Sequence, residues 1–334
     1  MSFEYHLACG SRETVSISSQ PGILLVGGAE KEKSGEREAT EWFLERAKGG
    51  KYLVLRTGGI GGQAKWICQH YRNWVHSAAE LSIDSREAAS DPKVIDYIRE
   101  ADALFIAGGD QTKYKKYWEG TETEKALNYL INDKKIPVAG TSAGMAILGD
   151  YYYAPDNDGI LSSEILDDPF HYNTHSLYRS DFIQVPYLKR VITDTHLDRM
   201  DEDNLETRYG RLLSLLAKII YEDNNQLSNY AIGLEEGAFV AIDEKGIARV
   251  FGNGTKLGQD AYFLQPNGVA PEQIEPGWPL IWNNKGKAVK VYQLSGNQEG
   301  SGYFDLKDWS TANGGTWEYW YTVGGKSGLT KEPF

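Results

Sequence analysis

The sequence is poor in cysteine and has no long hydrophobic run. Its two cysteines, Cys9 and Cys68, are too few for a disulfide framework or for a zinc site built from thiolates. No stretch reaches the roughly 18 apolar residues of a membrane-spanning helix, so we expect no membrane partner. The N-terminal region lacks a basic segment followed by an apolar one, so we see no signal peptide and expect a cytoplasmic location.

Positive charge is also in short supply. The 334 residues include 35 Lys and Arg against 47 Asp and Glu, a net charge of −12. Because this surface would repel phosphates, we exclude nucleic acid as a partner. A content of 41% hydrophobic and 25% charged residues is typical of a globular protein, and the length allows one large domain or a domain with an appendage.

Short apolar runs alternate with amphipathic stretches over the first two thirds of the chain. The runs are 23–26, 52–55, 103–107, 136–139, 191–193 and 231–234. Helices are predicted between them, including 36–48 and 205–221, and 151–186 is predicted to be irregular. This alternation predicts an α/β fold with a mostly parallel, doubly wound sheet flanked by helices. Ligands bind such sheets at the carboxyl ends of the strands.

The composition changes after about residue 253. Prolines punctuate the next stretch, and glycine-rich segments with Trp278, Trp282, Trp309, Trp317 and Trp320 follow. We therefore predict an α/β domain over 1–255 and an aromatic, glycine-rich β extension over 256–334. Residues 287–294 alternate like an exposed strand. We interpret the tryptophans as a small core rather than a binding surface.

The segment Gly140-Thr141-Ser142-Ala143-Gly144 lies between an apolar strand and an apolar helix. A nucleophile elbow needs this context, because the turn holds its serine at a strained backbone angle between very small residues. The pattern therefore predicts that Ser142 is a nucleophile. The alternative is a turn in which this serine only caps the helix.

A serine nucleophile needs a base and an acid that orients the base. His196 is the best base, since it directly follows the 191–193 strand. Glu235 and Glu236 follow another strand and are candidates for the acid. Adjacent residues point to opposite faces, so only one of them can face the imidazole. Asp194 is also near, on the same strand as His196.

The oxyanion that forms during attack needs N–H donors. Ala143, the residue after the nucleophile, supplies one, and the loop at Gly109 is placed to supply another. Asp110 and Gln111 would then flank the site and be available to substrate. We predict no cofactor and no metal, because the histidine pair at 171 and 175 has no third ligand in the sequence.

Several segments together resemble peptidase family S51, which contains cyanophycinases and aspartyl dipeptidase. They are Gly108-Gly109-Asp110-Gln111, Gly140-Thr141-Ser142-Ala143-Gly144, Asp194-Thr195-His196, Tyr209-Gly210-Arg211-Leu212-Leu213 and Ile232-Gly233-Leu234-Glu235-Glu236. The resemblance covers about residues 20–255. It implies a class I glutamine amidotransferase-like fold with serine at the elbow, and a homodimer. It also implies a Ser142–His196–Glu236 triad and substrate contacts from Gln111, Asp194 and one or more of Arg199, Arg208 and Arg211.

The resemblance implies an exopeptidase that releases dipeptides from a β-linked aspartyl-arginine polymer through an acyl-enzyme on Ser142. The substrate would be a peptide that can contain arginine. Two departures weaken that specificity: Thr195 stands where cyanophycinases usually have glutamine, and 197–207 interrupts their arginine-rich segment. Aspartyl dipeptidase activity is the alternative within the family.

Two further readings stay open. The segment 59–64 fits G-x-G-x-x-A after a strand, with Asp84 about 20 residues beyond it, as in dinucleotide-binding proteins. That reading leaves Ser142 without a role. The other is a non-catalytic module that binds a peptide or glycan through the aromatic extension.

Overall fold

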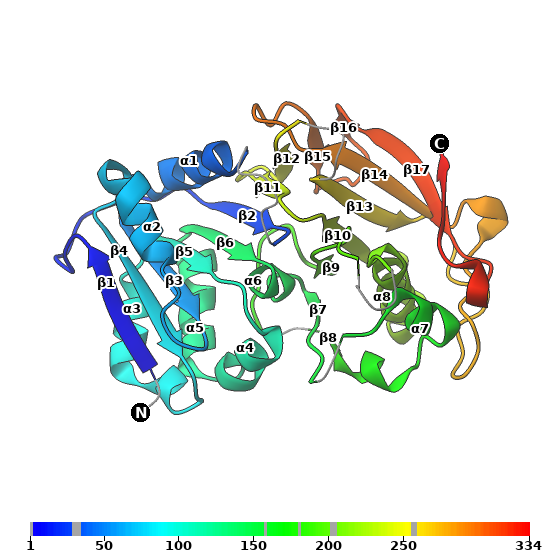
Figure 1. Cartoon of the computed structure of the whole chain (residues 1–334), viewed down its shortest axis with the longest axis horizontal. Helices are drawn as coiled ribbons and strands as arrows, with labels where there is room; N and C mark the ends of the chain where they lie inside the picture. Colours follow the sequence, from blue (N-terminus) through cyan, green and yellow to red (C-terminus); the bar gives the residue numbers. More distant parts are fainter. Residues whose placement is uncertain (1–2, 29–34, 157–158, 180–181, 201–205, 255–258) are drawn as a thin grey trace.

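The computed structural model describes residues 3–28, 35–156, 159–179, 182–200, 206–254 and 259–334, over which the strands form two sheets (Figure 1). The first sheet contains β1 (Phe3–Cys9), β2 (Gly22–Val26), β3 (Lys51–Arg56), β4 (Ser77–Ile83), β5 (Ala103–Ile106), β6 (Pro137–Thr141), β11 (Phe239–Ile242), β12 (Ile247–Phe251), β15 (Tyr303–Asp305) and β16 (Ala312–Asn313). Its order is β1-β4-β3-β5-β6-β2-β11-β12-β15-β16. Strands β4, β3, β5, β6 and β2 run parallel, and the outer strands pair antiparallel.

Both faces of the parallel strands are buried, which explains their continuous apolar sequences. In β2, Ile23 and Leu25 share a core with helices α3 (Pro92–Arg99) and α5 (Glu122–Asn128). The alternate residues Leu24 and Val26 share the opposite core with α1 (Glu36–Ala47) and α2 (Gln63–His70). The predicted α/β fold flanked by helices is confirmed, and the five central strands of the sheet are parallel.

The second sheet adjoins the carboxyl ends of the first. It contains β7 (Tyr151–Tyr153), β8 (Leu177–Arg179), β9 (Val191–Asp194), β10 (Tyr230–Leu234), β13 (Asp260–Pro266), β14 (Val289–Ser295), β17 (Thr316–Tyr321) and β18 (Thr330–Pro333). Its order is β18-β17-β14-β13-β10-β9-β7-β8. Helix α8 (Tyr209–Glu222) buries Leu212, Leu216 and Ile219 in the same core as this sheet. The shorter helices are α4 (Gln111–Trp118), α6 (Ala143–Ala146) and α7 (Ser162–Asp167).

The structure corrects several local expectations. The strands that end near Ser142, His196 and Glu236 belong to two sheets rather than one, with β6 in the first and β9 and β10 in the second. The supposedly irregular 151–186 contains β7, α7 and β8. Strand β14 is not exposed, because β13 and β17 pair on either side of it and Val289 and Val291 are buried. Helix α8 begins at Tyr209, and residue 205 lies outside the described part of the chain.

The C-terminal residues continue both sheets. Strands β13, β14, β17 and β18 extend the second sheet from β10, and β15 pairs with β12 of the first. Trp282, Trp309 and Trp320 are buried, whereas Trp278 is 60% exposed. Most of the aromatic residues therefore pack as core. The predicted domain boundary at residue 255 falls within 255–258, which lie outside the described residues. It therefore stays a prediction.

The two cysteines form a disulfide, which the sequence analysis did not anticipate. Cys9 on β1 and Cys68 on α2 are 59 residues apart in sequence, and their Cα atoms are 6.0 Å apart. The bond ties the edge strand of the first sheet to a covering helix. In the described part of the chain, no helix combines the length and the apolar character needed to cross a bilayer.

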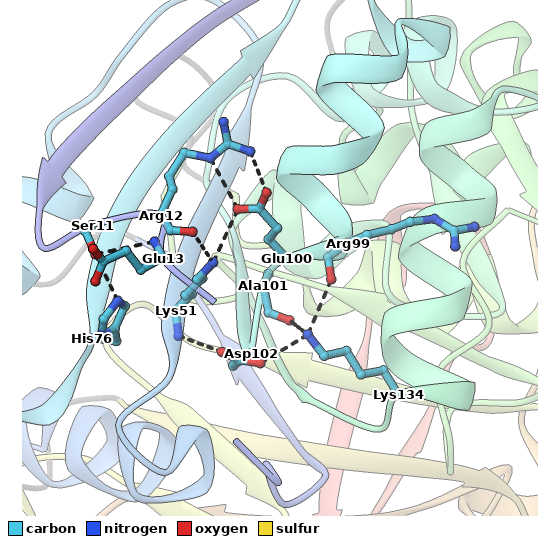
Figure 2. Close-up of polar contacts among 10 residues, drawn as sticks. All are labelled: Ser11, Arg12, Glu13, Lys51, His76, Arg99, Glu100, Ala101, Asp102 and Lys134. Atoms are coloured by element: carbon cyan, nitrogen blue, oxygen red, sulfur yellow. Dashed lines mark hydrogen bonds and ion pairs between the residues drawn. The ribbon is translucent and has the colours of Figure 1, made fainter. Parts of the chain in front are cut away.

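A network of polar contacts lies at the end of the first sheet where its parallel strands begin (Figure 2). Asp102, 4% exposed, accepts the Lys51 N–H at 2.9 Å and pairs with Lys134 Nζ at 3.1 Å. Lys134 also donates to the Ala101 carbonyl at 2.6 Å, and Lys51 Nζ donates to the Arg12 carbonyl at 2.9 Å. These bonds attach the segment after β1 and the segment before β6 to the starts of β3 and β5.

We expect Asp102→Ala to lower the free energy of unfolding by about 2 kcal/mol, because it leaves a buried N–H without its acceptor and removes the carboxylate that pairs with Lys134. Urea unfolding followed by circular dichroism measures the change. The control is Arg37→Ala, which removes an exposed ion pair to Glu41 and should change stability little. Equal effects in the two variants would contradict a structural role for this network.

Candidate active site

Ser142 lies on a sharp turn between β6 and α6. Its backbone angles are φ 52° and ψ −118°, a left-handed region that residues other than glycine rarely adopt. The strain is held by hydrogen bonds: the Ser142 N–H donates to the Val26 carbonyl at 3.1 Å, and its carbonyl accepts from Ala146 N at 2.9 Å. The turn has the geometry of a nucleophile elbow and leaves the half-buried hydroxyl free to meet other groups.

Three side chains that are distant in sequence form one chain of hydrogen bonds. Ser142 Oγ lies 2.7 Å from His196 Nε2, and His196 Nδ1 lies 2.7 Å from Glu236 Oε1. His196 and Glu236 are 8% and 7% exposed. The three groups come from the ends of β6, β9 and β10, so the site spans the junction of the two sheets.

The end of β2 connects these three segments through its backbone. The carbonyls of Val26, Gly27 and Gly28 accept from the N–H groups of Ser142, His196 and Gly237 at 3.1, 3.0 and 3.1 Å. Gly237 directly follows Glu236. A single short segment therefore sets the spacing of all three side chains.

Geometry selects one of the two adjacent glutamates. Glu236 faces the imidazole, and its N–H donates to Asp198 Oδ1 at 2.8 Å. Glu235 points away, into the second sheet, where its carboxylate accepts the hydroxyls of Tyr209 and Tyr262. The two adjacent side chains therefore face in opposite directions.

The environment of His196 favours the neutral form of its imidazole. Burial lowers the pKa of His196, the hydrogen bond that its Nδ1 donates to Glu236 opposes that shift, and the charges of Arg208 and Arg199 add to it. With the Nδ1 proton held by the carboxylate, the Nε2 lone pair faces the Ser142 hydroxyl. A neutral imidazole in this orientation can accept the hydroxyl proton.

The positions predicted to hold an oxyanion lie beside Ser142. Ala143 is in the first turn of α6, where helical N–H groups have no acceptor within the helix. The loop after β5 approaches closely: a Cβ placed on Gly108 would lie 3.4 Å from the Ser142 Cβ. Gly109 follows in that loop and is exposed. The role of the Gly109 and Ala143 N–H groups stays a prediction.

The predicted substrate residues fall into two groups. Asp110 is exposed and caps α4 through the Thr112 N–H, and Gln111 Nε2 donates to the Tyr153 carbonyl at 3.2 Å. Arg199 is exposed, and Arg208 is half-buried, donating to the Thr195 carbonyl at 3.1 Å. Burial, reinforced by the nearby Arg211 charge, lowers the pKa of Arg208 to about 10.

Asp194 and Arg211 form the second group, because they bind each other. Arg211 donates from Nε and Nη2 to the two carboxylate oxygens of Asp194 at 2.9 and 2.6 Å. Each residue is 6% exposed. A substrate would have to open this bidentate pair to reach either group.

Glycines at the end of β2 were missed as part of the site. A Cβ on Gly28 would lie 2.2 Å from His196 Cε1, and one on Gly27 would lie 1.9 Å from the Glu235 carbonyl oxygen. Both positions require glycine so that the imidazole and the β10 end can approach. The only signal in the sequence is a Gly-Gly pair after an apolar run, which also occurs after β5.

The loop that suggested dinucleotide binding is already filled. The Gly61 and Ala64 N–H groups donate to the two oxygens of Glu80 at 2.6 and 2.9 Å, and Gly58 N–H donates to Asp84. Glu80 is fully buried. A phosphate at this helix start would meet a carboxylate, so the structure argues against a dinucleotide site here.

The histidine pair does not assemble into a metal site. His171 accepts the Asn173 N–H through Nδ1 at 3.3 Å and precedes the short turn of helix that contains His175. Within the described residues, no group of three or more His, Cys, Asp and Glu side chains could hold a metal ion.

Comparison with known proteins places this geometry in a family. The model of peptidase family S51 matches residues 23–250. The chain belongs to that family, and it is a serine-type peptidase. It is 24% identical to a cyanophycinase of Trichormus variabilis over 243 residues, covering 71% of this chain and 73% of the relative. It is 23% identical to a cyanophycinase of Geminocystis herdmanii over 279 residues, covering 78% and 88%.

A similar solved structure is that of a peptidase from an acI-B1 Actinobacterium. It is 16% identical, with a TM-score of 0.49, over 84% of this chain and 96% of that chain.

We expect Gly28→Ala to reduce peptidase activity by about 100-fold, because the new methyl group displaces the His196 ring. The control is Gly268→Ala, which has a similar positive φ of 77° but open space around the added Cβ. It should lose stability by about 1 kcal/mol and keep its activity. The measurement is hydrolysis of a peptide substrate together with the rate at which a fluorophosphonate labels Ser142. Full activity in Gly28→Ala would refute this placement of the imidazole.

Proposed function

We propose that this protein is a cyanophycinase-like serine exopeptidase that cleaves β-linked aspartyl-arginine polymer to dipeptides. The observation that carries the catalytic part is the hydrogen-bonded chain of Ser142, His196 and Glu236 in a member of this peptidase family. The names of the curated relatives support the substrate. The proposed catalytic machinery needs no metal and no cofactor.

The proposed reaction follows the geometry. Ser142 Oγ attacks the scissile carbonyl while its proton passes to His196 Nε2 at 2.7 Å. Glu236 stabilises the imidazolium that results, and the N–H groups of Ala143 and Gly109 hold the oxyanion. His196 then protonates the leaving amine. Water, activated by the same imidazole, hydrolyses the acyl-enzyme and restores the serine.

Charged residues around the imidazole are proposed to bind the substrate. Arg199 and Arg208 lie close enough to His196 to lower its pKa, so a carboxylate held between them would lie near the reacting bond. Asp110 and Gln111, which follow β5, are proposed as further contacts to the substrate. Asp194 and Arg211 join only if substrate opens their ion pair, and otherwise the pair supports the Thr195 backbone.

Assembly and location remain predictions. We retain a homodimer and a cytoplasmic location as working expectations. The Cys9–Cys68 disulfide points the other way for location, since such bonds persist in oxidising compartments and are rare in the cytosol.

Substrate specificity can be tested by incubation with cyanophycin, β-Asp-Arg, isoaspartyl peptides and α-Asp-X dipeptides, with the products identified by mass. We expect β-Asp-Arg to accumulate from the polymer. The Ser142→Ala variant should lose all measurable hydrolysis and keep its stability. The control, Ser214→Ala, removes a buried hydroxyl that bonds within α8 and should remain active. Turnover of α-Asp-X dipeptides alone would assign the protein to the aspartyl dipeptidases, and activity in Ser142→Ala would refute the nucleophile.

The pH dependence of hydrolysis tests the proposed role of Glu236 as the acid that orients His196. Because the pKa of His196 is lowered, the acidic limb of kcat/KM should have its midpoint below the ordinary histidine value of about 6.5. We expect Glu236→Gln to lower kcat by about 10³- to 10⁴-fold and to move that midpoint further down, since the carboxylate raises the imidazole pKa. Glu244→Gln, at an exposed carboxylate, is the control. An unchanged limb and rate would show that Glu236 does not orient the base.

A further inference from the structure

Glu235, the neighbour of the proposed catalytic acid, is a buried carboxylate that the mechanism does not use. It is 4% exposed. Its Oε1 accepts the hydroxyls of Tyr209 and Tyr262, the latter at 2.8 Å, and its Oε2 accepts the Asp260 N–H at 3.1 Å. A buried carboxylate is costly unless it is fully hydrogen-bonded, so this one is held in a single orientation.

A lysine from the end of the second sheet completes the surroundings of Glu235. Lys331 Nζ on β18 lies 3.4 Å from the centroid of the Tyr209 ring, 4.5 Å from that of Trp320 and 5.1 Å from that of Tyr262. These three rings pack edge to face or tilted at 5.4 to 5.8 Å. The cation thus lies over the rings whose hydroxyls bind Glu235. Lys331 itself is exposed, whereas burial raises the pKa of Glu235.

The backbone of Glu235 is also held by hydrogen bonds, one of them to β13, the strand that contains Asp260. Its N–H donates to the Asp260 carbonyl at 3.0 Å, and its carbonyl accepts from the Ala238 N–H at 3.2 Å. Because both the backbone and the side chain of residue 235 are held by β13 and its neighbours, the next residue has little freedom. The carboxylate of Glu236, on that next residue, lies 2.7 Å from His196 Nδ1.

We propose that Glu235, Tyr262 and Lys331 are positioning residues that aim Glu236 at His196, so that the strands after residue 258 form part of the catalytic framework. This inference rests on the proposed function. Asp260, Tyr262, Trp320 and Lys331 all lie beyond residue 250, where the match to the family model ends. The C-terminal strands of this chain thereby take on a role in aligning the triad.

The test compares Tyr262→Phe and Lys331→Met with two matched controls, Tyr319→Phe and Lys287→Met. The controls remove the same groups from another lysine and tyrosine pair of this sheet, in which Lys287 Nζ lies 5.5 Å from the Tyr319 ring. Two readouts are used for each variant: kcat and KM against pH, and the rate at which a fluorophosphonate labels Ser142. Circular dichroism and thermal unfolding show that each variant is folded.

We expect Tyr262→Phe and Lys331→Met to lower kcat and the labelling rate by about tenfold, with KM nearly unchanged. In both variants, the midpoint of the acidic limb of the pH profile should move to lower pH. The reason is that a loosely held Glu236 carboxylate raises the pKa of His196 less. A purely structural role would lower the melting temperature without moving this limb. If Tyr262→Phe and Lys331→Met have the same rates and the same acidic-limb midpoints as the controls, the inference is overturned. The proposed triad would be unaffected by that result. Absence of labelling in the unmodified protein would overturn the proposed function itself.

Discussion

The backbone at the end of β2 is the constraint on which the site depends. Three successive carbonyls, from Val26 to Gly28, accept hydrogen bonds from Ser142, from His196 and from the residue after Glu236. Backbone hydrogen bonds tolerate little displacement, so they set distances between side chains that come from different sheets. The strain at Ser142 persists because this framework over-determines its conformation.

Much of the architecture, and most of the side chains that meet at the candidate site, could be predicted from sequence. Continuous apolar runs between helical segments require a parallel sheet buried on both faces, and residues after such runs gather at one edge. Ser142, His196 and the glutamate pair could be found in this way, because each follows such a run. It could not reveal that β9 and β10 belong to a second sheet, because an apolar run does not specify its pairing partner.

The sequence also could not separate residues whose meaning depends on their neighbours in space. Asp194 and Arg211 look like ligand-binding groups until the fold closes them on each other. Gly28 looks like any glycine at a strand end until the imidazole comes to rest against it. Glu235 and Glu236 have the same side chain, and only the surrounding hydroxyls, amides and imidazole assign them different tasks.

The division of the triad between two sheets also affects how the molecule fails. The hydroxyl belongs to one sheet, and the imidazole and carboxylate belong to the other. A small parting of the sheets separates nucleophile from base while every strand keeps its ladder of hydrogen bonds. On warming, we expect such a protein to lose its activity while its secondary structure is still intact, and to regain that activity on cooling once the sheets close again.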